Sequence, residues 1–494
     1  MNKENNEKLG FAQLMGSFTK PFWVASIMEL FERWAWYGLF AVLALYLTGS
    51  TDEGGLGFTH IEKGQIMGFV TAILYLLPLF TGVLSDKIGY KLSLIIAYVM
   101  LMTGYYFMGE VTTYSSVFLV FLYVAVGAAI FKPVASAIIT KSTNKSNSTL
   151  GFGIFYMMVN IGGFIGPAFS STLRTQYGWK IVFIQAAVVI FINLLIVIFF
   201  FKEPNRVKND ETIGQAMVSA IRNIWEAIKD SRLSVLLVIM VGFWTMFNQL
   251  FYTLPTFIED WVDTAVLHDS IAQISPALAS FMSGGGTSVN PEMLINIDAG
   301  SIVLLQLLVS FFVLKMRHVS AMISGFIVAA IGIGITFYTG NGLFTILGIV
   351  IFAVGEMMTN PTFSSFIALI SPKGKEALYM GTYFVPVFAG NLLTTFISGN
   401  LYQAWSDKLS LLQTEMASRG LAMPEISENF SKNEYFALAS EKLEMTQTQM
   451  TQFIWDTYQP NSIWYVIVGI GAVTIAALFI YDNLVIKPKE KQAV

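Results

Sequence analysis

Long apolar runs recur along the whole of this 494-residue chain, and they constrain its fold more than any other feature. Each run is roughly 18–25 residues long, which is the length of helix that crosses the hydrocarbon core of a bilayer. Hydrophobic residues make up 55% of the chain and charged residues only 12%, too little polar surface for a soluble protein of this length. The runs therefore predict an all-α, multi-pass protein of the lipid bilayer.

We expect about twelve transmembrane helices, because about twelve runs satisfy the length criterion. They cover roughly residues 21–48, 62–86, 91–109, 114–140, 149–172, 180–201, 233–256, 292–315, 319–338, 341–371, 376–402 and 461–486. With both termini inside, the cytoplasmic segments hold about 20 of the 29 lysine and arginine residues and the outer loops about seven. This asymmetry predicts cytoplasmic termini and a location in the plasma (cytoplasmic or inner) membrane.

A charged stretch between the sixth and seventh predicted spans divides the chain into two halves. We expect an N-terminal six-helix bundle over 1–201, a cytoplasmic linker over 202–232 and a C-terminal six-helix bundle over 233–494. The second bundle carries a long extracytoplasmic insertion at about 403–460, for which a passive cap is the simplest role. Apolar residues recur in the linker at helical spacing, at Ile213, Met217, Ile221, Ile224 and Ile228. The spacing predicts an amphipathic helix on the inner membrane surface; a helix that docks a partner is the alternative.

Three charged residues interrupt the first predicted span, in the stretch "MELFERWAWYG". Glu29, Glu32 and Arg33 stand at i, i+3 and i+4, so they share one face of a helix. Each such residue costs about 3 kcal/mol at the centre of a membrane helix, which favours a water-filled cavity lined by protein. A carboxylate–arginine cluster can hold and release a proton during transport. Such a cluster is poorly suited to catalysing hydrolysis, because no nucleophilic side chain stands near it in the sequence.

Ionisable residues also interrupt three other spans, at Lys132, Asp298 and Glu356. Because they are spread over both halves, they predict a central binding site with a proton relay; a static ion pair that locks two helices together is the alternative. With no cysteine, the chain has no disulfide framework and no thiolate metal site or nucleophile. We therefore expect no enzyme activity, no cofactor, no metal and no nucleic-acid partner. A membrane enzyme or a receptor-like binder that uses residues 403–460 is the alternative from another class.

Several stretches resemble known transporter motifs. "GVLSDKIGYK" (82–91) resembles the inner-loop signature of the major facilitator superfamily. "ELFERWAWYG" resembles the E-x-x-E-R-F-x-Y-Y signature of the proton-coupled oligopeptide transporter (POT/PTR) family within that superfamily. Four further stretches resemble that family's motifs on the fourth, fifth, seventh and tenth helices. They are "GAAIFKPVASAI" (127–138), "GFGIFYMMVNIGGFIGP" (151–167), "GFWTMFNQ" (242–249) and "VGEMMTNPT" (354–362).

The resemblance implies the major facilitator fold and a symporter that imports di- or tripeptides with protons by alternating access. It implies that Glu29, Glu32, Arg33 and Lys132 couple proton movement to the cargo. It also implies a binding site made of Arg33, Tyr37, Tyr75, Lys132, Tyr156, Asn160, Trp244, Asn248, Asp298 and Glu356. In that site the cations attract the peptide carboxylate and Glu356 attracts the amino terminus. The expected partners are a small peptide, protons and the lipid bilayer, and the expected working unit is a monomer.

Some positions depart from the family pattern. Phe40 stands where the family usually has an arginine, and Asn248 stands where its acidic partner would be, so we expect the outer gate to be rebuilt. Asp298 replaces the usual asparagine, and Val134 replaces the asparagine that follows the Lys-Pro pair. Asp298 is either a second ligand for an amino terminus or an added protonation site, and either role favours more positively charged cargo. A carrier of another small organic or inorganic anion remains the alternative, although such a carrier has little use for Glu356.

Overall fold

The computed structural model describes residues 11–144, 147–203, 212–338, 340–373, 375–427 and 429–488. In these ranges the regular structure is helical apart from two isolated β-bridges. Ten helices are long and apolar enough to cross a membrane, and a bent pair, His60–Leu76 with Pro78–Ile88, makes up to eleven. Together with the long charged helix α2 (Lys20–Thr48), they account for the predicted spans. The prediction of an all-α, multi-pass fold is confirmed.

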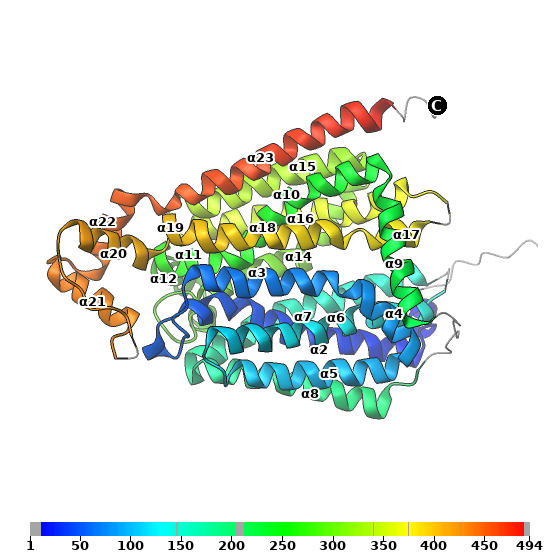
Figure 1. The fold of residues 1–494 in the computed structure, drawn as a ribbon, viewed down its shortest axis with the longest axis horizontal. Coiled ribbons are helices and arrows are strands. Elements are labelled where there is room, and N and C mark those ends of the chain that lie inside the picture. The colour runs from blue at the N-terminus through cyan, green and yellow to red at the C-terminus, as the bar shows by residue number, and fades with distance from the viewer. Residues whose placement is uncertain are drawn as a thin grey trace, which may run out of the picture.

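The first half of the chain forms one bundle, which occupies the lower part of Figure 1. Its helices are α2, α3 (His60–Leu76), α4 (Pro78–Ile88), α5 (Tyr90–Met108), α6 (Tyr114–Ser142), α7 (Ser148–Tyr177) and α8 (Trp179–Phe200). Their buried side chains, among them Phe22, Leu39 and Phe121, form one apolar core. Small residues let α2 and α7 approach closely, because a Cβ on Gly166 would lie only 2.4 Å from the carbonyl oxygen of Trp34.

The second half forms the upper bundle in Figure 1 and has a core of its own, which includes Phe243, Phe257 and Phe326. Its helices are α10 (Ser231–Tyr252), α11 (Leu254–Trp261), α12 (Ala265–Ile274), α13 (Pro276–Ser283), α14 (Pro291–Val313), α15 (His318–Tyr338), α16 (Gly342–Ile370), α17 (Glu376–Gly381), α18 (Phe384–Phe396), α19 (Tyr402–Trp405) and α23 (Ile463–Tyr481). Tyr252, at the end of α10, packs instead with the core of the first half. The two bundles therefore join around this residue.

A short helix, α9 (Ile213–Ile228), lies between the two bundles in sequence and contacts both α4 and α17. A capping box fixes its start, because the Thr212 hydroxyl accepts from the Gln215 N–H and the Gln215 side chain accepts from the Thr212 N–H. One face leaves Ile221 and Trp225 exposed. A helix therefore forms where the sequence predicts one in the linker, and its place on the inner membrane surface stays a prediction. Residues 204–211 of the linker lie outside the described part of the chain.

Three helices project beyond the second bundle, at the end of the molecule opposite α9 (Figure 1). They are α20 (Lys408–Ser418), α21 (Lys432–Lys442) and α22 (Gln447–Tyr458), and we call them the cap. The cap reaches the first half, because Asn433 Nδ2 donates to Asp52 Oδ2 (3.2 Å) and to Glu53 Oε1 (2.9 Å). We refer to the two ends of the molecule as the cap end and the linker end. The C-terminal end of α23 lies at the linker end.

Candidate functional site

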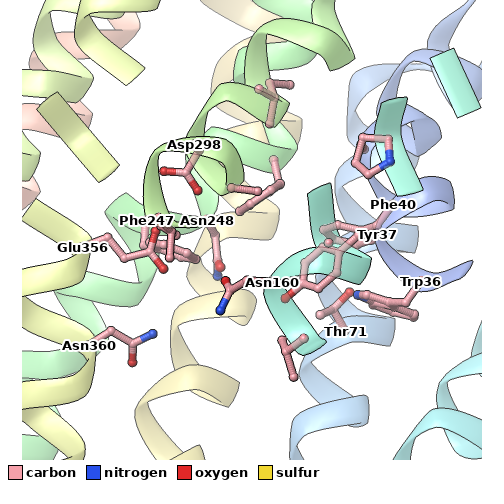
Figure 2. Close-up of a pocket in the computed structure, with 18 of the residues that line it drawn as sticks. Trp36, Tyr37, Phe40, Thr71, Asn160, Phe247, Asn248, Asp298, Glu356 and Asn360 are labelled. Carbon is pink, nitrogen blue, oxygen red and sulfur yellow. The ribbon is translucent and has the colours of Figure 1, made fainter. Parts of the chain in front are cut away.

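A cavity with an empty volume of about 1150 Å³ lies between the two bundles. Helices α2, α3 and α7 of the first half line it together with α10, α14, α16 and α18 of the second half. Figure 2 shows aromatic, amide and carboxylate side chains that point into it from both sides. Because both halves line the cavity, it needs both bundles to be complete.

Most of the predicted binding residues meet at this cavity. Those that line it are Tyr37, Tyr75, Tyr156, Asn160, Trp244, Asn248, Asp298 and Glu356. Arg33 and Lys132 are not among the lining residues, but each lies against an aromatic ring that is. The Arg33 guanidinium carbon is 5.8 Å from the ring centroid of Tyr37, and Lys132 Nζ is 4.2 Å from that of Tyr75. The two cations thus face the cavity through aromatic rings that attract positive charge.

The charge cluster of α2 is fully packed inside the first bundle. Arg33 Nε donates to Glu32 Oε2 at 2.5 Å and lies 3.3 Å from Glu29 Oε1. All three residues are buried, Glu32 completely, and Glu32 Oε1 has no hydrogen-bond partner in the described part of the chain. Two carboxylates therefore share one guanidinium. This arrangement is one charge away from neutrality, and a single proton would balance it.

Two acidic residues face the cavity from the second half, Asp298 on α14 and Glu356 on α16 (Figure 2). They are 4% and 9% exposed. Asp298 Oδ1 and Glu356 Oε2 are buried without a hydrogen-bond partner in the described residues. A buried carboxylate oxygen without a donor is costly, so these two oxygens can accept hydrogen bonds from a group that enters the cavity.

Two of the residues that depart from the family pattern, Phe40 of α2 and Asn248 of α10, also line the cavity. Phe40 packs edge-on against Tyr252, with ring centroids 5.6 Å apart. Asn248 Nδ2 lies 3.5 Å from Thr394 Oγ1, within its own bundle. An aromatic contact between the bundles therefore stands where the family pattern has an ion pair.

The sequence analysis missed several lining residues, including Thr71, Phe247, Asn360 and Asn391. Asn360 could have been found, because it stands one helical turn after Glu356 and so shares its face. Its Oδ1 accepts from Tyr383 Oη at 2.5 Å. Thr71 and Asn391 carried no signal of their own, since polar residues of this kind occur in many membrane helices.

A salt bridge joins the two bundles at the cap end. Arg174, near the end of α7, donates from Nε to Glu292 Oε1 (3.0 Å) and from Nη2 to Glu292 Oε2 (3.2 Å), at the start of α14. These two hydrogen bonds make the pair bidentate. Because Glu292 is fully buried, its carboxylate is shielded from water. Neither residue was predicted to be functional. An ion pair between the bundles is thus found at Arg174 and Glu292 and not at positions 40 and 248; the rebuilt outer gate stays a prediction.

A second polar joint at the cap end contains His60 and Lys63 of α3. His60 Nε2 lies 3.4 Å from Asp407 Oδ1, and Lys63 Nζ donates to the Tyr252 carbonyl oxygen at 2.9 Å. His60, Asp260 and Asp407 bring their ligand atoms within 4.8 Å of one another, as a metal site would. Lys63 is buried beside them and interacts electrostatically with the same two aspartates. The group therefore joins the two bundles at the cap end.

Replacing Glu292 by glutamine is expected to weaken closure at the cap end, because removing one partner of a buried ion pair costs about 3–5 kcal/mol. Spin labels on cysteines at Thr51 and Gln413, in a chain without native cysteine, would report the distance between the halves. We expect the variant to add a population at longer distance. Lys180→Gln, which breaks an exposed pair with Glu110 inside the first half, is the control. An unchanged distance distribution in Glu292→Gln would contradict the role of this pair.

Comparison with known proteins supports the architecture. The model of the Major Facilitator Superfamily matches residues 25–289. Dipeptide and tripeptide permease B of Aliivibrio fischeri is 30% identical over 169 residues, 33% of this chain and 33% of that protein. Dipeptide and tripeptide permease A of Serratia proteamaculans is 28% identical over 201 residues, 39% of this chain and 38% of that protein. The matched part of the chain thus spans little more than a third of these curated relatives.

The whole fold is similar to solved transporter structures. A mutant of the nucleoside transporter NupG aligns with a TM-score of 0.68 at 12% identity, over 93% of this chain and 99% of that chain. A peptide transporter POT in complex with sulfate aligns at 0.66 and 16% identity, over 97% of both chains. A POT family transporter in complex with 5-aminolevulinic acid aligns at 0.65 and 17% identity, over 98% of both. At these identities the similarity establishes the fold.

Proposed function

The chain belongs to the major facilitator superfamily, and from this premise we propose that it is a proton-coupled symporter that imports di- or tripeptides by alternating access. Its family and fold are those of multi-pass membrane transporters, not of enzymes. The observation that carries the proposal is the polarity of the cavity. Two carboxylates line its second-half side, and two cations lie behind aromatic rings on its first-half side.

This polarity suits a short peptide zwitterion. Glu356 would bind the amino terminus of the peptide. Arg33 and Lys132 would attract its carboxylate from behind the aromatic rings that line the cavity. Aromatic and amide walls between the two ends accept side chains of varied chemistry. The names of the sequence relatives, dipeptide and tripeptide permeases, support the same cargo class.

The cluster of Glu29, Glu32 and Arg33 would carry the proton. Two carboxylates on one guanidinium leave a negative charge that a proton can neutralise, and Lys132 of α6 interacts electrostatically with this cluster from the other side. Cargo carboxylate and cluster carboxylates would then compete for the same cations, which links proton release to cargo release.

Alternating access would use the two ends of the molecule in turn. The Arg174–Glu292 pair and the His60–Asp407 joint hold the cap end closed. Opening would break these contacts while the helices at the linker end approach, with α9 as the connection between the bundles. We place the linker end and both termini in the cytoplasm, the protein in the plasma (inner) membrane, and the working unit at one chain.

Uptake of a labelled dipeptide into proteoliposomes tests the proposal. A pH step of about 2 units can drive up to about hundredfold accumulation at one proton per cargo, since each unit stores about 1.4 kcal/mol. We expect uptake under an inward proton gradient to exceed uptake without a gradient at least about fivefold. A proton ionophore should abolish the excess, and protein-free liposomes give the background. If no member of a varied peptide panel shows gradient-dependent uptake, the proposal fails.

A further inference from the structure

The charges that line the cavity have one sign. Among the described lining residues the acids are Asp298 and Glu356, and none is a lysine, arginine or histidine. The nearest cations are already engaged, Arg33 with two glutamates and Lys132 with the ring of Tyr75. The cavity therefore presents two carboxyl groups to its contents and, among the described residues, no basic side chain at its surface.

One carboxylate oxygen of each of these two acids is left without a donor from the described part of the chain. Asp298 Oδ1 and Glu356 Oε2 have no partner in the described residues, although both side chains are more than nine-tenths buried. Asn360 interacts with the Glu356 side chain, and three neighbouring amides donate to backbone carbonyl groups. Asn160 Nδ2 donates to the Tyr156 carbonyl oxygen (2.8 Å), Asn296 Nδ2 to that of Phe164 (2.8 Å) and Asn391 Nδ2 to that of Val387 (2.8 Å). The missing donors must come from what the cavity binds, or from protons.

Two other buried polar atoms of the lining residues also lack a hydrogen-bond partner in the described residues. Asn296 Oδ1 is a third buried acceptor, and Trp244 Nε1 is a buried donor. The two acids stand on different helices, α14 and α16, which pack against each other within one bundle. Their separation is therefore a fixed feature of the second half, and it does not depend on how the two halves approach. Figure 2 shows both acids on the same side of the cavity.

We propose that Asp298 and Glu356 together bind two cationic amino groups of one cargo molecule, so that the preferred cargo is a dipeptide whose first residue is basic. One ammonium would be the amino terminus and the other the end of a lysine-like side chain, with the peptide carbonyl accepting from Trp244 Nε1. This inference rests on the proposed peptide cargo. It makes Asp298 the residue that sets specificity, because a single carboxylate would be enough for an ordinary amino terminus.

Binding of four compounds to the purified full chain in lipid nanodiscs tests this inference. Lysyl-alanine and norleucyl-alanine have side chains of nearly equal length, and only the first carries a second ammonium. We expect the wild type to bind lysyl-alanine at least about tenfold more tightly than norleucyl-alanine, because only lysyl-alanine has a side-chain ammonium that can pair with the second buried carboxylate. Alanyl-lysine, with its ammonium at the other end, should bind more weakly than lysyl-alanine. The fourth compound, 1,5-diaminopentane, should compete with lysyl-alanine.

The Asp298→Asn variant keeps the shape of the side chain and removes its charge. We expect it to reduce the lysyl-alanine to norleucyl-alanine affinity ratio to within about twofold. Asp269→Asn, at an exposed aspartate of α12, should keep the wild-type ratio. The inference is overturned if the wild type shows no preference, or if Asp298→Asn keeps the preference and changes only the pH dependence of uptake. Because the ligand series needs no variant, a folding defect cannot hide the answer.

The outcomes also separate this inference from the proposed function. If the two dipeptides bind equally well, peptide transport stands and the two-amine site is overturned. If 1,5-diaminopentane binds and Asp298→Asn abolishes its binding while no dipeptide binds, the two-amine site is supported and the peptide function fails. The shared chemistry, two ammonium groups on one small molecule, is therefore tested apart from the peptide backbone.

Discussion

Replacing Glu32 by glutamine is expected to abolish accumulation of cargo under a proton gradient, while cargo exchange without a gradient continues. Glu32 is fully buried, holds Arg33 at 2.5 Å and has one oxygen without a partner. Glutamine keeps the shape but cannot carry the proton. Without this proton site the gradient no longer drives transport, so uptake under the gradient should fall to the level measured without a gradient, at least about fivefold lower.

Two assays in the same proteoliposomes separate coupling from binding. Uptake under an inward proton gradient reports coupling, and counterflow against preloaded unlabelled peptide reports cargo movement alone. Glu226→Gln, an exposed glutamate on α9, is the matched control and should behave as the wild type in both. If Glu32→Gln loses counterflow to the same extent as driven uptake, the residue serves folding or binding, and its role in coupling is refuted.

The existence of the spans could be predicted from the sequence, but the breaks within them could not. The run over 62–86 reads as one continuous helix, yet the structure bends it by 48° between α3 and α4. Pro78 begins the second segment, where a missing N–H weakens the helix. Similarly, the run over 376–402 contains α17, α18 and a π-helical turn, Ile397–Leu401. The length of an apolar run predicts that a segment lies in the lipid. It does not reveal local changes in backbone hydrogen bonding such as these.

Many of the residues that line the cavity could be predicted from the sequence, because they stand out from the apolar residues around them. A charge in an apolar run, such as Asp298 or Glu356, is costly and therefore conspicuous. The joints at the cap end gave no such signal. Arg174 and Glu292 stand at helix ends, where charges are ordinary, and their pairing depends on contact between residues 118 positions apart. Only the packing of the two bundles reveals that these charges are buried and matched.

Helices α3 and α18 of the two bundles pack closely against each other, and glycine makes this possible. A Cβ on Gly64 would lie 2.7 Å from the Thr395 carbonyl oxygen and 2.8 Å from the Gly399 Cα. Both are backbone atoms, so no rotation of a side chain can relieve the clash. A larger residue at position 64 must therefore hold the bundles apart at the cap end.

Gly64→Val is thus expected to keep the cap end open and to reduce uptake at least about tenfold, because overpacking costs about 1–3 kcal/mol or more and opposes only the closed state. The spin-label pair at Thr51 and Gln413 should move to longer distance in the same variant. Gly469→Val on α23, where a Cβ meets nothing within 4 Å, controls for the loss of a helical glycine. If Gly64→Val lowered uptake without lengthening the distance, the cap-end contact would not be the gate. Both effects together would identify closure of α3 against α18 as a required step of the transport cycle.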